Sequence, residues 1–179
     1  MRTKMATAAV LASAGDMIAQ RLEGLAVLSV GRVLTLVAVN VCYITPILTA
    51  FYSLNEWLCG KVLGLPSGTT KGTAARLAFD QLANAPIVIF GFFMAFGLAN
   101  NLIATPLSGG AIAPLSTVLA STLSLVRREY VGTVLKNWLV WVPPQFLNFA
   151  IVPPKLRVPF ASLVALVWNV ITSLIANSK

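Results

Sequence analysis

The last third of the chain, from Asn137 to Asn169, restricts the fold more than any other stretch. It contains two apolar runs that only the short sequence PPKLR separates. The first of these runs also carries the amides Gln145 and Asn148. An unpaired polar group costs several kcal/mol in hydrocarbon, so we expect these side chains to face protein or water. The rest of the chain has to provide that environment.

The proportion of charged residues is too low for a soluble protein. Of the 179 residues, 58% are hydrophobic and 10% are charged, whereas soluble domains contain about 25% charged residues. We therefore predict an all-α integral membrane protein, a bundle of four to five transmembrane helices. The length suits a single membrane-embedded domain over residues 1–179.

Five apolar runs are candidates for these helices: residues 1–20, 32–58, 76–103, 137–152 and 158–176. The first run resembles a signal peptide in its basic start and its small residues. Asp16 and Gln20 favour a retained helix instead, because they share a helical face with small residues and would pack against neighbouring helices. Residues 115–135 finish with the charged sequence RREY and form either a short span or an amphipathic helix at the membrane surface.

The net charge of +8 does not indicate nucleic-acid binding. The thirteen Lys and Arg residues are scattered between the apolar runs, where cations anchor membrane helices at the lipid headgroups. They divide seven to six between the two sides of a five-helix bundle, so the positive-inside rule gives no orientation.

Residues that commonly carry enzymatic chemistry are scarce. The chain has no histidine, which removes the commonest general base and metal ligand. Cys42 and Cys59 are too widely spaced for a CxxC motif, which favours two separate thiols over a disulfide or metal site. The sequence contains no Gly-rich phosphate loop. We expect no enzymatic activity, no cofactor and no bound metal.

Two carboxylates within apolar runs need an explanation. A charge near the centre of a membrane helix costs about 2.5–3.5 kcal/mol, so Asp16 and Asp80 require water, a partner or a shallow position. Arg76 lies one turn before Asp80 and Asn84 one turn after it, which predicts a polar stripe along one helix. This stripe either lines a water-filled path, clamps helices together, or places Arg76 and Asp80 at the headgroups.

The C-terminal helices carry a second polar set. Trp141, Gln145 and Asn148 share one helical face. In the last run, Trp168 and Asn169 are followed by Ser173, which continues a stripe of small and polar residues at four-residue spacing. Such residues usually form interhelical hydrogen bonds, which favours helix packing over the lining of a solute pathway.

These residues resemble the Mpv-seventeen and PMP-twenty-two family of small organelle membrane proteins. The C-terminal part of the resemblance comprises Asn137, Trp138, Trp141, Gln145, Asn148, Phe149, Val152, Pro153, Arg157, Trp168 and Asn169. Asp80-Gln81 followed by Ala85-Pro86 matches a middle signature, and Gly15-Asp16 with Gln20 matches an N-terminal one. The chain departs from the pattern at Val142, Thr49, Phe51 and Ile171, where proline, histidine, tryptophan and tyrosine are usual.

The resemblance implies a multi-span protein of the mitochondrial inner membrane, with the peroxisomal or plastid membrane as alternatives. It also implies a channel for small solutes that supports mitochondrial homeostasis, or else a non-conducting structural or assembly protein. The expected partners are the lipid bilayer, small solutes and further copies of the chain, without direct nucleic-acid contact. The residues predicted to line a pore or to pack helices are Asp16, Gln20, Arg76, Asp80, Gln81, Trp141, Gln145, Asn148, Arg157, Trp168 and Asn169.

Overall fold

The computed structural model describes residues 2–66, 68–150 and 157–177, with the backbone alone for 148–150, 157–159, 161 and 162. Helices form five rods, and the described residues contain no strand, which confirms the all-α prediction. Three rods are single helices: α1 (Arg2–Leu22), α7 (Leu115–Ala150) and α8 (Arg157–Ala176). The second rod along the chain consists of α2 (Val30–Val39), η1 (Asn40–Ile44), α3 (Thr45–Glu56) and η2 (Trp57–Val62). The third rod consists of α4 (Thr70–Phe79), η3 (Asp80–Asn84), α5 (Ala85–Ala99), η4 (Asn100–Ala104) and α6 (Thr105–Leu107).

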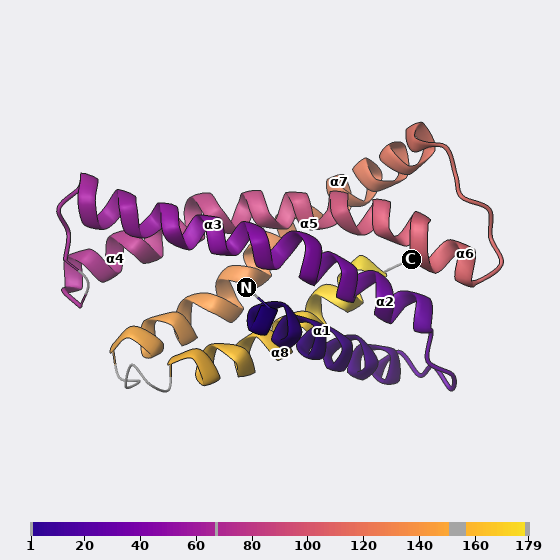
Figure 1. Cartoon of the computed structure of the whole chain (residues 1–179), viewed down its shortest axis with the longest axis horizontal. Helices are drawn as coiled ribbons and strands as arrows, with labels where there is room; N and C mark the ends of the chain where they lie inside the picture. Colours follow the sequence, from indigo (N-terminus) through magenta and orange to yellow (C-terminus); the bar gives the residue numbers. More distant parts are fainter. Residues whose placement is uncertain (1, 67, 151–156, 178–179) are drawn as a thin grey trace.

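The second and third rods are the clearest membrane spans. They are 33 and 38 residues long, and both are apolar enough to cross a bilayer. At about 1.5 Å per residue, each exceeds the roughly 30 Å of a hydrocarbon core. Figure 1 shows them along the long axis of the molecule, with α1 and α8 beneath them and α7 crossing behind. The number of membrane crossings beyond these two stays a prediction.

Three prolines lie inside these rods without ending them. Each follows a π-helical turn: Asn40–Ile44 precedes Pro46, Asp80–Asn84 precedes Pro86, and Asn100–Ala104 precedes Pro106. Proline has no N–H, and its ring crowds the carbonyl one turn earlier. In each case the N–H directly before the proline bonds a carbonyl five residues back, so the widened turn absorbs the conflict.

The second and third rods are antiparallel neighbours. Gly31 lies against Ala104 at one end, and the Asn55 side chain donates to the Arg76 carbonyl near the other, at 3.0 Å. Midway, Gly91 lies directly under the Tyr43 ring, where any side chain would overlap the phenol. Small residues permit such close contact between helices.

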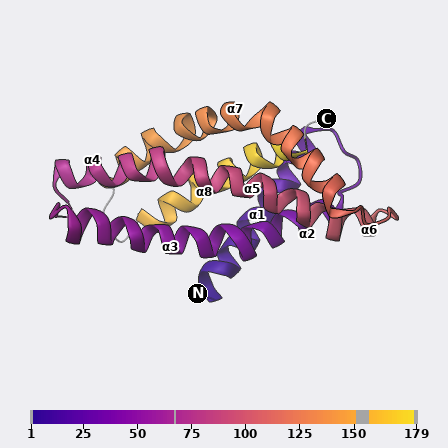
Figure 2. The same ribbon diagram turned by 90° about the horizontal axis from the view of Figure 1, so that it is seen from above.

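Helix α7 runs antiparallel to the third rod. Thr122 packs on Gly97, the Tyr130 hydroxyl donates to the Pro86 carbonyl at 3.1 Å, and the Trp138 indole donates to the Gln81 carbonyl at 2.9 Å. The buried core lies where the second rod, the third rod, α7 and α8 meet, around the fully buried Phe93. Figure 2, the view from above, shows α7 beside the third rod, on the side away from the second rod.

One boundary prediction was wrong. Residues 115–135 and 137–152 were expected to be separate segments, but α7 continues from Leu115 to Ala150 through Pro143 and Pro144. The charged sequence RRE interrupts the hydropathy, yet Arg and Glu are good helix formers. The contacts of α7 with the third rod support the helix on both sides of these charges.

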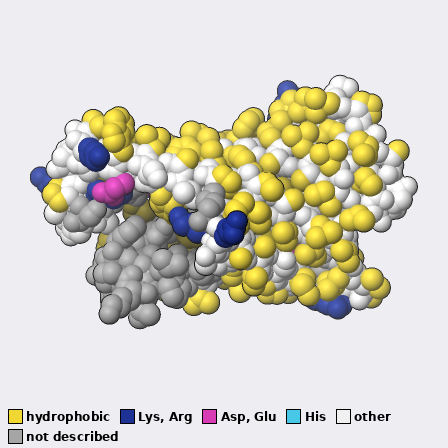
Figure 3. All heavy atoms as spheres, viewed as in Figure 1, with side chains coloured by type: hydrophobic (Ala, Val, Ile, Leu, Met, Phe, Trp, Pro, Cys, Tyr) yellow, Lys and Arg dark blue, Asp and Glu magenta, His cyan; other side chains and the backbone are white. Residues whose placement is uncertain are grey.

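The surface agrees with an environment of lipid. Large hydrophobic side chains are exposed along both long rods, including Leu82 at 68%, Leu102 at 61% and Ile87 at 54%. Figure 3 shows hydrophobic atoms spread over much of one face, with few charged side chains among them. Exposed apolar surface of this extent is typical of a membrane or partner interface.

Candidate functional site

Asp16 is the centre of a buried ionic network. Its side chain and that of Gln20 are fully buried, one turn apart on the same face of α1. Asp16 Oδ1 lies 2.8 Å from Arg32 Nε in α2 and accepts a hydrogen bond from Ser173 Oγ in α8. Asp16 Oδ2 accepts from the Gln20 amide at 2.7 Å. The carboxylate therefore joins three helices. We call Asp16, Gln20, Glu23, Ser29, Arg32 and Ser173 the Asp16 network.

Arg32 lies between two carboxylates. Its remaining nitrogens form a bidentate pair with Glu23 in the α1–α2 turn, with Nη2 and Oε1 2.9 Å apart. Nη2 also donates to Ser173 Oγ at 3.0 Å. The hydrogen bond from Arg32 lowers the pKa of the Glu23 carboxyl below its ordinary value, and the charge of the guanidinium acts in the same direction.

Gln20 fixes the turn between α1 and α2. Its side-chain oxygen accepts from the Ser29 N–H at 2.6 Å, and its nitrogen donates to the Ser29 carbonyl at 3.2 Å. The amide thus bonds the Ser29 N–H, which has no helical partner at the start of α2, and is a second donor to the Ser29 carbonyl, which also accepts from the Val33 N–H at 3.2 Å.

Gly15, the residue before Asp16, lies where α1 contacts α8 closely. A Cβ at Gly15 would lie 2.6 Å from Asn169 Cβ and 3.1 Å from the Asn169 carbonyl carbon. Only a residue without a side chain allows α1 to approach α8 so closely. The stripe that contains Asn169 and Ser173 thus lies in the contact between α8 and α1.

A second polar cluster joins the third rod to α7. Asp80 accepts hydrogen bonds from the Gln81 amide at 2.8 Å and the Asn84 amide at 2.7 Å. Gln81 accepts in turn from Asn137 at 3.2 Å, while Trp138 donates to the Gln81 backbone. These five residues form the Asp80 network. Gln81, Asn84 and Asn137 are all buried, and Asn84 Oδ1 has no hydrogen-bond partner in the described part of the chain.

Arg76 does not complete the predicted stripe with Asp80. Asp80 and Asn84 do bond, but the Arg76 guanidinium forms a two-fold pair with Glu56 of the second rod, at 2.9 Å for each contact. It also donates to the carbonyls of Leu65 and Gly72 in and after the connecting loop. The long arginine side chain thus reaches the end of the hairpin, where Glu56 is 62% exposed. An ion pair this exposed contributes at most about 1 kcal/mol.

The other predicted residues lie on α7 and α8, and Asn169 packs on Gly15, next to Asp16. Gln145 is buried, and Trp141, Trp168 and Asn169 are half-buried. The side chains of Asn148 and Arg157 lie outside the described residues. Asp16 and Gln20 contact α2 and α8, whereas Asp80 and Gln81 contact their own rod and α7.

Sequence reasoning missed the partners of the two carboxylates. Arg32 begins an apolar run and was grouped with the headgroup anchors, although its guanidinium is buried beside Asp16. Asn137 was noted as a polar residue of the C-terminal block, but its contact with Gln81 spans 56 positions. The burial cost of Asp16 indicated a need for water, a partner or a shallow position, but not that one of the thirteen cations would pair with it.

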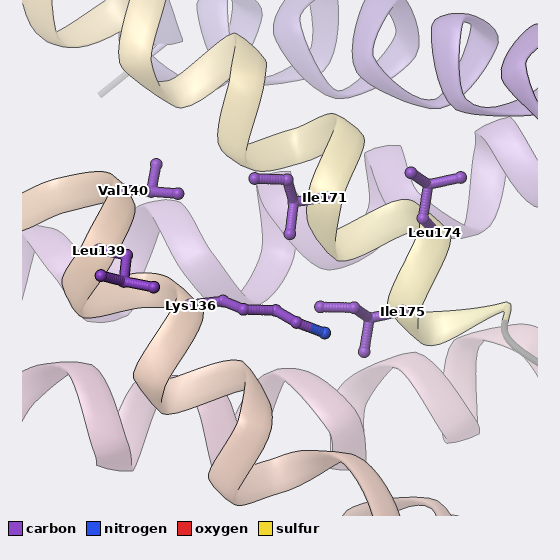
Figure 4. Close-up of a pocket in the computed structure, with 6 residues that line it drawn as sticks. All are labelled: Lys136, Leu139, Val140, Ile171, Leu174 and Ile175. Carbon is purple, nitrogen blue, oxygen red and sulfur yellow. The ribbon is translucent and has the colours of Figure 1, made fainter.

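A shallow groove lies elsewhere, between α7 and α8. It has a volume of about 310 Å³ and is lined by Lys136, Leu139, Val140, Ile171, Leu174 and Ile175. Figure 4 shows Lys136 extending from α7 toward Ile175 of α8. Apart from this ammonium the lining is aliphatic, so the groove offers little to orient a polar solute. The described residues contain no cluster of His, Cys, Asp and Glu suited to a metal ion.

Comparison with known proteins places the chain among membrane proteins of organelles. Residues 118–173, from α7 into α8, match the Mpv17 / PMP22 family. The chain is 29% identical to PXMP2/4 family protein 2 of Dictyostelium discoideum, over 99% of this chain and 84% of that protein. It is 26% identical to the mitochondrial inner membrane protein Mpv17 of Mus musculus, over 94% and 85%. It is also 35% identical to a vacuolar membrane protein of Saccharomyces cerevisiae, over 58% and 29%.

No solved structure matches the chain. The names of the Mpv17 relatives agree with the predicted mitochondrial inner membrane, and the PXMP2/4 name fits the peroxisomal alternative. The family match covers the same C-terminal block whose residue pattern carried the resemblance. With relatives that align over nearly its whole length, the chain is similar to the Mpv17 / PMP22 family of membrane proteins.

Proposed function

We propose that this protein is a non-enzymatic, channel-like component of the mitochondrial inner membrane that passes small solutes and so supports mitochondrial homeostasis. The observation that carries this proposal is the Asp80 network, a polar cluster inside a membrane-spanning rod that its protein neighbours leave incompletely bonded.

The depth of Asp80 makes this cluster significant. We place the bilayer centre at the middle of the third rod, near Val88. Asp80 is then about 12 Å from it along the helix, within the roughly 15 Å half-thickness of the hydrocarbon. A carboxylate at such depth needs a counter-charge or water. Two amides bond it, and within the described residues no cation pairs with it.

The Asn84 side chain is a second group in this network that requires water as a hydrogen-bond partner. Its side-chain oxygen is buried beside Asp80 without a donor in the described part of the chain. A buried oxygen of this kind is normally bonded to an ordered water. Water that reaches the Asp80 network at this depth would provide the beginning of a path for polar solutes.

Planar-bilayer recording tests the proposal. Purified protein should conduct, and Asp80→Asn should change single-channel conductance or the reversal potential in a salt gradient, because it removes a charge from the path. Glu56→Gln is the matched control, since it removes an exposed carboxylate at the end of the hairpin. Electrical silence of folded wild-type protein would reject a channel.

The Asp16 network favours a second candidate, a non-conducting structural or assembly protein. Its carboxylates are paired with Arg32, and its bonds connect three helices. If the whole protein served this role, Asp80→Asn would change thermal stability without any effect on membrane permeability.

A further inference from the structure

The hydrogen bonds of the Asp80 network all point toward the carboxylate. Asn137 Nδ2 of α7 donates to Gln81 Oε1 at 3.2 Å, and Gln81 Nε2 donates to Asp80 Oδ2 at 2.8 Å. Asn84 Nδ2 donates to Asp80 Oδ1 at 2.7 Å. Each carboxylate oxygen therefore accepts an N–H, and hydrogen bonds of this kind favour the charged form of an acid. The network is arranged for an ionised Asp80.

The Gln81 side chain depends on α7 for its orientation. An amide has a donating and an accepting end, and Gln81 turns the first to Asp80 and the second to Asn137. If the Gln81 amide alone were reversed, its oxygen would face the carboxylate and its nitrogen would face the Asn137 nitrogen. Both hydrogen bonds would then be lost. A bonded network of the opposite direction needs Asn137 to turn as well and Asp80 to take up a proton.

The contact between Gln81 and Asn137 is buried, with both residues 6% exposed. A buried hydrogen bond is costly to break because little water is available to replace the lost partner. The neighbouring Trp138 donates to the Gln81 backbone carbonyl at 2.9 Å. Two successive residues of α7 thus hold Gln81, but only Asn137 acts on the end of its side chain.

Other charged and titratable groups near Asp80 come from three elements. Tyr52 of α3 is near enough for an electrostatic interaction with the carboxylate. Arg76 of α4 pairs with Glu56, at the end of α3. Lys136 of α7 extends into the groove with α8 (Figure 4). In the part of the chain that the structure describes, the hydrogen bonds to Asp80 come from amides.

We propose that Asn137 is a positioning residue for Asp80: through Gln81 it keeps the carboxylate ionised, so that α7 sets the charge of the proposed solute path. A movement of α7 that separates Asn137 from Gln81 would release the amide and ease protonation of Asp80. The inference rests on the proposed function for the effect of this charge on a solute. The charge itself can be measured in a protein that does not conduct.

Carbon-13 NMR measures this charge directly, because the only aspartates of the chain are Asp16 and Asp80. Protein labelled at the aspartate carboxyl carbon and embedded in lipid should give one signal for each, and Asp80→Asn assigns them. Asn137→Leu should raise the pH midpoint of the Asp80 signal by about half a pH unit or more, the effect of one lost hydrogen bond. The Asp16 signal should not change between the two proteins. An unchanged Asp80 midpoint would overturn the inference.

Trp138→Phe is the matched control. It removes the adjacent bond between α7 and the third rod, but that bond reaches the Gln81 backbone and leaves the side-chain amide in place. The Asp80 midpoint should therefore stay at its wild-type value. A rise equal to that of Asn137→Leu would show that any loosening of α7 has this effect, and would overturn the positioning role.

A double variant tests whether Asn137 acts through Gln81. Gln81→Leu removes the intermediate amide, so adding Asn137→Leu to it should raise the Asp80 midpoint no further. A second rise as large as that of Asn137→Leu alone would mean that Asn137 acts on Asp80 by another route, which contradicts the proposal.

Planar-bilayer recording connects this charge to conduction. The pH dependence of single-channel conductance should shift in the same direction in Asn137→Leu and should disappear in Asp80→Asn. Electrical silence together with a raised NMR midpoint in Asn137→Leu would reject the channel and support the positioning role. A conducting protein whose NMR midpoint is unchanged in Asn137→Leu would support the channel and overturn the positioning role.

Discussion

The two polar networks treat a buried carboxylate in opposite ways. Asp16 is fully buried and has an arginine at 2.8 Å. Asp80, within the third rod, is bonded by two amides, while the nearby Arg76 pairs with Glu56 instead. A carboxylate with a counter-charge can hold helices together in a dry interior, whereas one with amides alone depends on water. The Asp16 network is therefore a structural one, whereas the proposed solute path rests on the Asp80 network.

The largest effect should follow loss of the cation in the Asp16 network. Arg32→Met leaves Asp16 buried without a counter-charge, which should lower the free energy of unfolding by about 3–5 kcal/mol. Denaturant unfolding in detergent measures this loss, with the exposed Lys71→Gln as control. Adding Asp16→Asn to Arg32→Met should recover part of the stability. Additive losses would show that the two residues do not interact.

A smaller loss is expected from the contact that brings α1 to α8. Gly15→Ala places a methyl group 2.6 Å from Asn169 Cβ, and the helices must separate. Overpacking of this kind typically costs about 1–3 kcal/mol. Gly132→Ala is the matched control, because a Cβ there meets nothing within 4 Å. Thermal melts of both variants measure the effect. Equal melting temperatures would contradict the expectation.

The Asp80 network should respond weakly in stability. Asp80→Asn breaks no ion pair within the described residues but removes one of the two acceptor oxygens that Gln81 and Asn84 bond. The lost hydrogen bond costs about 1 kcal/mol, and the lower burial cost of a neutral amide offsets part of it, so we expect a change below about 1 kcal/mol. The same denaturant assay measures it. A loss as large as that of Arg32→Met would mean that Asp80 has a structural counter-charge.

The smallest effect concerns pH. The pKa of Glu23 is lowered in the folded protein by Arg32, so its contribution is present above the unfolded value of about 4.3 and is lost as pH falls through the folded value. Thermal melts between about pH 6 and pH 3 should show less acid destabilisation for Glu23→Gln than for wild type. Parallel curves would indicate that the Glu23–Arg32 pair contributes nothing.

The helical, membrane-embedded architecture could be predicted from the sequence because apolar runs and a low charge content leave few alternatives. The same holds for the small-residue contacts, such as the stripe of Asn169 and Ser173 that meets Gly15. The carboxylates were recognised by their burial cost, but their partners were not. Arg32 is 16 positions from Asp16, and Ser173 is 157 positions away. Periodicity relates residues within one helix and cannot identify such distant contacts.

The π-helical turns have a consequence for chain length. Each π-helical turn contains one residue more than an α-helical turn. Because the wide turn accommodates this residue, the helical segments before and after it keep the directions in which their side chains point. Removing one residue elsewhere in a rod would rotate everything beyond it by about 100°. Within Asn40–Ile44 or Asn100–Ala104, a single deletion could instead convert the wide turn to a normal one and leave both ends in register. Related chains that differ by one residue at these places would therefore retain the same helix contacts.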